Sequence, residues 1–188
     1  MFDVLPVTSA RPTDCGATCM KMLLAYYGQD VALDQLIREC DTRLIGCTAG
    51  DLKRCGVAHG LEMVAYQMDA AELIRQDRPA IVHWKHRHWC MFCGRDDDGN
   101  VVICNPDRGR YRLPPDTFAA MYTGVSLFNG EPEDYTPRAE KNYAPGECFM
   151  HNGELCKAIA PIAKGAMLTL NTNYIITSVE KELAALNQ

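Results

Sequence analysis

Residues 13–28 read TDCGATCMKMLLAYYG, and this stretch predicts the first helix of the chain. Its apolar side chains recur at the three- and four-residue intervals that place them on one helix face. Thr13 or Asp14 can accept hydrogen bonds from the free N–H groups of the first turn, and Gly28 follows where the helix would end. We therefore expect a helix that packs on a core and carries Cys15 at or next to its N-terminus.

The position of Cys15 suits a nucleophile. A helix N-terminus favours the thiolate, which is the reactive form of cysteine. A thiol with an ordinary pKa of about 8.5 is only slightly ionised at neutral pH, so a histidine base is also needed. His88 stands at the start of an apolar strand, and Asn105 ends the strand expected beside it. Cys15, His88 and Asn105 therefore form a candidate triad in which Asn105 orients the imidazole.

The rest of the chain changes from helical to strand-like patterns. Further helices are expected over residues 32–40, 49–59, 70–75 and 117–122, and strands over 80–93, 100–105 and 110–113. Residues 130–137 are polar and contain two prolines, which predicts a linker. We place two domains at residues 1–130 and 131–188. Strands flanking the Asn-Gly pair at 152–153, a strand over 169–176 and a helix over 179–186 predict a small β-rich second domain.

Composition limits the classes of protein to which the chain can belong. The 188 residues are 47% hydrophobic and 23% charged, as in an ordinary globular protein. A net charge of -5 argues against nucleic acid as a partner, because phosphate binding needs clustered basic side chains. No apolar stretch approaches the roughly 20 residues that span a bilayer, and residues 1–3 do not resemble a signal peptide. We expect a cytoplasmic protein with no membrane partner.

Ten cysteines are scattered through helical and strand-like segments, which is not the pattern of a disulfide framework. Nine of them are expected to be reduced packing residues, with Cys15 the exception. A zinc site could be sought in the cluster of His83, His86, His88, Cys90 and Cys93. Alternating side-chain directions along a strand would divide this set between two faces, so we expect no metal and no cofactor.

Several blocks of the sequence, in order, resemble the double-glycine leader peptidases of cysteine peptidase family 39. They are residues 13–19, 26–28 and 79–84, His88 with its apolar strand, Asn105 with Pro106, and Phe118. The resemblance covers about residues 3–124 and implies an α+β, papain-like fold. It also implies that Cys15 is the nucleophile and His88 the general base. The third position is most often Asp in that family and is Asn105 here, which still forms a workable triad.

One position departs from the pattern of that family. Six residues before the nucleophile the family usually carries a Gln that donates to the oxyanion, and this chain has Ser9. Loss of one such donor typically costs about 3 to 4 kcal/mol, or roughly a hundred- to thousandfold in rate. The hydroxyl of Ser9 or Thr8 and the backbone N–H of Cys15 remain as donors. We therefore expect Ser9 to be a weak oxyanion donor and the enzyme to be slow.

Three hypotheses about function follow. The first is a cysteine peptidase that cleaves a peptide or protein substrate after Gly-Gly, or cleaves cell-wall peptides. The second is an inactive peptidase-like module that binds peptides. The third comes from residues 131–188, which resemble small β modules of phage tail and prophage structural proteins. That resemblance implies attachment to a larger assembly or surface polymer, and the alternative is an ordinary β appendage that stabilises the first domain.

Overall fold

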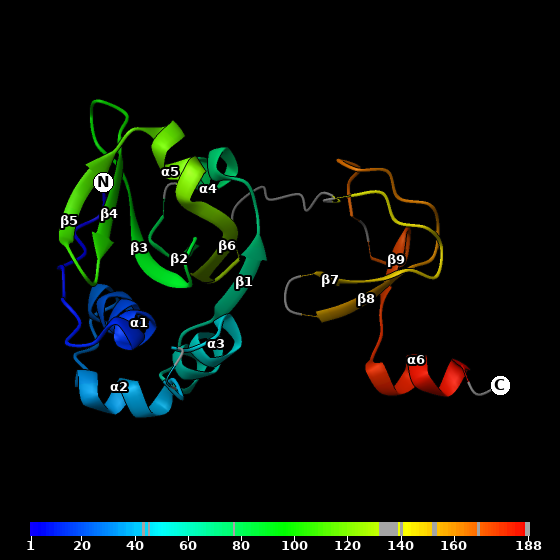
Figure 1. Cartoon of the computed structure of the whole chain (residues 1–188), viewed down its shortest axis with the longest axis horizontal. Helices are drawn as coiled ribbons and strands as arrows, with labels where there is room; N and C mark the ends of the chain where they lie inside the picture. Colours follow the sequence, from blue (N-terminus) through cyan, green and yellow to red (C-terminus); the bar gives the residue numbers. More distant parts are fainter. Residues whose placement is uncertain are drawn as a thin grey trace. The chain divides into compact units, whose positions relative to one another are not determined.

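The computed structural model describes residues 1–42, 44, 46–76, 78–131, 139, 141–151, 154–168 and 170–186. The chain divides into two compact units, Met1–Glu133 and Asp134–Gln188 (Figure 1). Among the described residues, no helix is both long enough and apolar enough to cross a membrane.

The first unit combines helices with one antiparallel sheet. Its elements are η1 (Pro12–Asp14), α1 (Cys15–Tyr26), α2 (Leu33–Glu39), α3 (Ala49–Ala58), β1 (Met63–Gln67), α4 (Ala70–Gln76), β2 (Ala80–Trp84), β3 (His88–Arg95), β4 (Val101–Asn105), β5 (Gly109–Leu113), α5 (Pro115–Met121) and β6 (Tyr122–Asn129). The strands follow the order β1-β6-β2-β3-β4-β5 with antiparallel neighbours. Figure 1 shows α1, α2 and α3 below the sheet and α4 and α5 above it.

The helix expected within residues 13–28 forms as α1 and supplies much of the core. Met20, Leu23 and Leu24 of α1 are fully buried, and they belong to the same apolar cluster as Ile81 of β2 and Met91 of β3. Full burial of one such side chain contributes about 1.5 to 3 kcal/mol. The apolar face that the sequence predicts is thus the face by which α1 packs against the centre of the sheet.

The single strand expected over residues 80–93 is wrong, because this stretch is the hairpin of β2 and β3. Trp84 pairs with His88, and the residues between them form the turn. His86 and Arg87 have φ angles of 65° and 60° in this turn, a conformation that non-glycine residues adopt rarely. No glycine or proline marks the turn, so the sequence alone predicts one continuous strand. The structure has two strands in this stretch, and His88 is the first residue of the second, β3.

Two strands were not predicted. β1 and β6 pair with each other, from Met63 opposite Asn129 to Gln67 opposite Val125. β6 also pairs with β2, so it lies between β1 and β2 inside the sheet. The partners are far apart in the sequence, and a local pattern does not show such pairing.

The second unit has a sheet and a small core of its own. β7 (Cys148–His151), β8 (Glu154–Ala158) and β9 (Tyr174–Ile176) form an antiparallel sheet, and α6 (Val179–Leu186) ends the unit. Rings of Tyr143 and Phe149 stack with their centroids 4.3 Å apart. The Asn-Gly turn expected at 152–153 lies outside the described residues, and the strand expected over 169–176 is restricted to β9.

Candidate active site

Cys15 is the first residue of α1, and its side chain is buried. The side-chain cap expected from Thr13 or Asp14 is wrong, since α1 has no such hydrogen bond. The Asp14 carboxylate instead accepts hydrogen bonds from Arg11 Nε at 3.0 Å and from Thr13 Oγ1 at 3.4 Å. The pairing with Arg11 holds the Asp14 carboxylate away from the first turn of the helix.

Competing effects act on the Cys15 thiol. Burial raises its pKa above the ordinary value, and hydrogen bonds from the backbone N–H groups of Trp89 and Gly16 lower the pKa in part. The Asp107 carboxylate adds a smaller effect that raises it. The net shift is upward, so the isolated thiol is protonated at neutral pH and needs a base nearby to react.

His88 and Asn105 are joined by a hydrogen bond. His88 Nε2 lies 3.0 Å from Asn105 Oδ1, which also accepts the backbone N–H of Asp107 at 2.7 Å. The Asn105 amide nitrogen donates to the Tyr111 hydroxyl at 3.2 Å. Because the Asp107 N–H can only donate, the oxygen of Asn105 must face Asp107 and His88. His88 Nε2 is therefore the donor, which leaves Nδ1 of the neutral ring as the proton acceptor.

The structure brings the three residues of the predicted triad to one region. Trp89 follows His88 in β3, and its backbone N–H lies close enough to the Cys15 sulfur to lower the pKa of that thiol. The start of β3 therefore lies against the start of α1. Asn105 ends β4, which is paired with β3, and joins the site through His88.

Ser9, in the segment before η1, packs against the loop that follows Asn105 and is hydrogen-bonded to the backbone and to a carboxylate of that loop. Its backbone N–H donates to the Pro106 carbonyl at 2.9 Å, and its hydroxyl donates to Asp107 Oδ1 at 3.4 Å. The other Asp107 oxygen lies 3.8 Å from His88 Nε2. Asp107 was missed by the sequence reasoning, although its place two residues beyond Asn105 was a usable signal.

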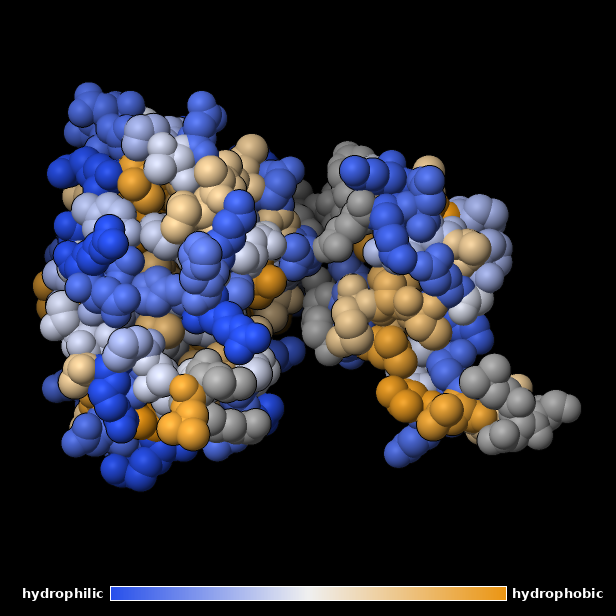
Figure 2. Space-filling view, in the orientation of Figure 1, coloured by the Kyte–Doolittle hydropathy of each residue, from blue (hydrophilic) through white to orange (hydrophobic). Residues whose placement is uncertain are grey.

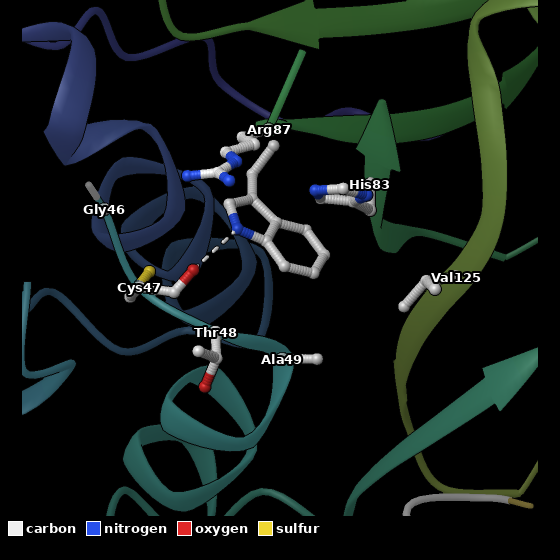
Figure 3. Close-up of a pocket in the computed structure, with 8 residues that line it drawn as sticks. Gly46, Cys47, Thr48, Ala49, His83, Arg87 and Val125 are labelled. Carbon is white, nitrogen blue, oxygen red and sulfur yellow. Dashed lines mark hydrogen bonds between the residues drawn. The ribbon is translucent and has the colours of Figure 1, made fainter. Parts of the chain in front are cut away.

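A cavity of about 400 Å³ opens beside this region (Figure 3). Figure 3 shows Cys47, Thr48 and Ala49 on one side of the cavity, with His83 and Val125 on the other. The complete lining is Gly46, Cys47, Thr48, Ala49, His83, Arg87, Trp89 and Val125. Trp89 Nε1 donates to the Cys47 carbonyl at 3.1 Å, so the same residue that contacts Cys15 through its backbone also forms a wall of the cavity.

His83 is held in the cavity wall as a neutral ring. Thr123 Oγ1 donates to the His83 carbonyl at 3.1 Å, so it must accept from His83 Nδ1, which lies 2.9 Å away. Burial lowers the pKa of His83, and the nearby His88 lowers it further. Nε2 is then the ring nitrogen that can accept a hydrogen bond from a ligand.

The packing around position 16 explains why the residue after Cys15 is glycine. A Cβ atom at position 16 would overlap the Cys47 sulfur and press on the Trp89 ring. The segment that forms the cavity wall can approach α1 only because residue 16 is glycine.

Comparison with known proteins agrees with this architecture. Residues 5–134 match the Peptidase C39 family. The chain is 31% identical over 136 residues to the transport/processing ATP-binding protein ComA of Streptococcus pneumoniae, covering 68% of this chain and 19% of ComA. It is 27% identical over 126 residues to the probable microcin-H47 secretion/processing ATP-binding protein MchF of Escherichia coli, covering 65% of this chain and 18% of MchF. The chain thus spans about a fifth of the length of these curated relatives.

Two solved structures are similar to the first unit. One is a double glycine motif protease from an AMS/PCAT transporter in complex with the leader peptide, with a TM-score of 0.63 and 28% identity over 66% of this chain and 89% of that chain. The other, the peptidase domain of Streptococcus ComA, has a TM-score of 0.62 and 22% identity over 66% of this chain and 96% of that one, and it supports the fold alone. These likenesses confirm the expected α+β, papain-like fold, and the match over residues 5–134 shows that the chain belongs to the Peptidase C39 family.

Proposed function

We propose that this chain is a cysteine peptidase in which Cys15 is the nucleophile, His88 the general base and Asn105 the residue that orients the imidazole. The observation that carries the proposal is the hydrogen bond between His88 and Asn105, with the amide oriented by the Asp107 N–H. This arrangement leaves His88 Nδ1 to accept the Cys15 proton.

The reaction then proceeds in two stages. The Cys15 sulfur attacks the scissile carbonyl as its proton passes to His88 Nδ1, and a tetrahedral oxyanion forms. The intermediate collapses to a thioester as His88 returns the proton to the leaving amine. Water, deprotonated by His88, then attacks the thioester and releases the acid, and the Cys15 thiol recovers its proton.

The oxyanion of that intermediate is proposed to lie at the start of α1. Backbone N–H groups there carry the partial positive charge of the helix end. Ser9 supports Asp107 through its hydroxyl and is therefore at best a weak donor to the oxyanion. We expect turnover to be slower by roughly a hundred- to thousandfold than with a complete oxyanion hole.

We propose that the substrate is a peptide cleaved after Gly-Gly. The support is likeness: a similar solved structure is a double glycine motif protease with its leader peptide, and the curated relatives are processing and transport proteins. The cavity beside Trp89 suits an apolar side chain that precedes the glycines, because its walls include Ala49 and Val125.

The decisive experiment measures peptide hydrolysis by mass spectrometry. We expect the whole chain to cut a Gly-Gly peptide after the second glycine, and Cys15→Ala to lose more than about a thousandfold in kcat/KM because the thioester cannot form. Cys148→Ala is the matched control, since Cys148 is an exposed free thiol of the second unit. A cell-wall cross-link peptide in parallel tests the other substrate class. Hydrolysis that survives Cys15→Ala would disprove the mechanism.

A peptide-binding module without activity is the second candidate. Ser9 in place of the expected Gln and the raised pKa of Cys15 both favour it over a fast enzyme. If neither the wild-type chain nor Cys15→Ala cuts any peptide but both bind the Gly-Gly peptide, the binding function replaces the peptidase.

Attachment to a larger assembly stays a prediction for residues 131–188. Figure 2 shows apolar surface on the second unit, and Ile176, Val179 and Leu183 there are exposed. Light scattering of the whole chain tests this prediction: self-assembly that Leu183→Asp abolishes would support it, and a single-chain mass at high concentration would favour the simple appendage.

A further inference from the structure

Potential metal ligands meet where α2 and α3 end. Glu39 is the last residue of α2, and Cys40 follows it. Cys55 lies in the last turn of α3, and His59 follows that helix. Cys55 and His59 are four residues apart, so they share a helix face. None of these residues belongs to the proposed peptidase site.

The donor atoms lie close together. One ligand atom from each of Glu39, Cys55 and His59 lies within 4.8 Å of the other two, and His59 Nε2 is 2.6 Å from Glu39 Oε2. The Cys40 thiol is close enough to the Cys55 thiol for each to shift the pKa of the other, but it lies outside this three-residue group and would supply a fourth donor only once its side chain turns toward the group. Across the described part of the chain, Glu39, Cys55 and His59 form the only group of three or more such side chains with this spacing.

We propose that Glu39, Cys40, Cys55 and His59 form a structural zinc site. Two sulfurs, one imidazole nitrogen and one carboxylate oxygen are donors that zinc accepts in a closed tetrahedral site. Bond lengths of about 2.0 to 2.3 Å place tetrahedral ligands about 3.3 to 3.8 Å apart. The donors of Glu39, Cys55 and His59 need only small shifts to reach these separations, and the Cys40 side chain would turn to join them. The Glu39 side chain is 37% exposed and can open the short contact with His59.

The charge and proton balance of the site is simple. Zn²⁺ forms bonds to both sulfurs as the two thiols release their protons to solvent, and neutral His59 binds through Nε2. Two thiolates and one carboxylate leave the complex with a single negative charge. The C-terminal end of α3 carries a partial negative charge, which favours a cation at this place.

Outer contacts hold the ligands in position. Gln35 Nε2 donates to Glu39 Oε1 at 2.8 Å, which leaves Oε2 for the metal. Gln29 Nε2 donates to the His59 carbonyl at 3.0 Å and anchors the backbone of that ligand. Cys40 and Cys55 are buried in the apolar core of the first unit. Such outer contacts are typical of metal sites and orient the first ligands.

The proposed metal would fasten the segment that builds the cavity wall. Residues 46–49 line the cavity and lie in the chain between Cys40 and Cys55. Zinc at the base of this segment would close it as a loop and restrict it in the folded state. The role is structural, and zinc itself takes no part in the proposed hydrolysis.

The test measures zinc in the whole chain after production with zinc and reductant and dialysis into metal-free buffer. Cys15→Ala serves as the parent, so zinc held by the Cys15 thiol does not count. We expect one zinc per chain, and Co²⁺ in its place should show sulfur-to-cobalt charge transfer. Cys55→Ser should lose both signals, and Glu39→Gln should weaken the affinity for zinc by about tenfold or more.

Cys148→Ser and His86→Gln are the matched controls, since Cys148 is exposed and His86 lies in the β2–β3 turn. Both should keep the full zinc content. Cys55→Ser could lose zinc because it misfolds. Glu39→Gln tests the site without this ambiguity, because Glu39 lies at the surface and its substitution should not disturb the core. The proposal is wrong if the parent contains no zinc or if zinc remains bound after Cys55→Ser. It is also wrong if the intact mass under the same conditions is lower by two hydrogens because Cys40 and Cys55 form a disulfide.

Discussion

Cys15 and Cys55 are both buried cysteines in helices of the first unit, but they lie at opposite ends of their helices. Cys15 begins α1, where backbone N–H groups reach its sulfur and a histidine begins the facing strand. Cys55 lies near the end of α3, beside a second thiol, a histidine and a carboxylate. The same residue type therefore has different surroundings. Cys15 lies at a positive helix end near one histidine, and Cys55 lies at a negative helix end among several side chains that can bind metal.

The largest expected difference between the two sites is in alkylation. Iodoacetamide should modify Cys15 at neutral pH, and His88→Ala should slow this by about a hundredfold or more, because burial raises the pKa of the Cys15 thiol and the base is lost. The rate at Cys55 should not change. Peptide mapping by mass spectrometry gives both rates, with exposed Cys148 as the internal reference. His86→Gln is the histidine control. Equal Cys15 rates with and without His88 would contradict the proposed base.

A glycine substitution tests how tightly the cavity wall packs on α1. Gly16→Ala would push on the Cys47 sulfur and the Trp89 ring, so we expect a loss of about 1 to 3 kcal/mol in the free energy of unfolding. Gly50→Ala, inside α3, is the matched control: its nearest neighbours lie 3.6 and 3.7 Å from the added Cβ. It should be neutral or stabilising by up to about 1 kcal/mol. Urea unfolding measures both, and equal effects would show that the contact at Gly16 is unimportant.

The smallest expected effect is the pH dependence of stability. Burial raises the pKa of Cys19, and that of Cys47 to about 12, whereas thiols of the unfolded chain ionise near about 8.5. Above that pH the unfolded state binds fewer protons, so the free energy of unfolding should fall as pH rises. Each such cysteine contributes up to about 1.4 kcal/mol per pH unit, and the stabilisation is complete below about pH 8.5.

Urea unfolding with reductant between pH 7.5 and 9.5 measures this slope. Cys47→Ser should flatten it, whereas Cys148→Ser should leave it unchanged. Bound zinc would keep Cys40 and Cys55 deprotonated in the folded state, so a chelator should steepen the slope. If a chelator does not change the slope, Cys40 and Cys55 do not bind zinc as thiolates, and the proposed difference between them and the protonated packing thiols is wrong.

The accuracy of the sequence-based predictions followed how local each feature is. The helices were predicted within a few residues, because the spacing of apolar side chains in α1 and the glycine after it are local signals. β1 and β6 were missed, since residues 63–67 pair with residues 125–129 and only the folded chain brings them together. The turn between β2 and β3 was missed because His86 and Arg87 adopt positive φ angles without a glycine.

The candidate site shows the same division. Cys15, His88 and Asn105 could be named in advance because a helix start, a strand start and a family resemblance converge on them. Trp89 and Cys47 could not, since each contributes through a contact with a distant segment. Asp107 was missed although it lies only two residues beyond Asn105. The spacing of Cys55 and His59 was visible in the sequence, but Glu39 and Cys40 became candidate ligands only through the packing of α2 near α3.

The amino-acid sequence alone was enough to indicate the fold class, the helix that carries Cys15 and the chemical types of the candidate triad. Those properties depend on periodicity and on residue type, which neighbouring residues express without tertiary contacts. Only the tertiary structure decided which ring nitrogen of His88 carries the proton, which group accepts the hydrogen bond of the Ser9 hydroxyl, and which thiols lie close together. These depend on hydrogen bonds between segments far apart in the chain, and such contacts exist only once the core has brought those segments together.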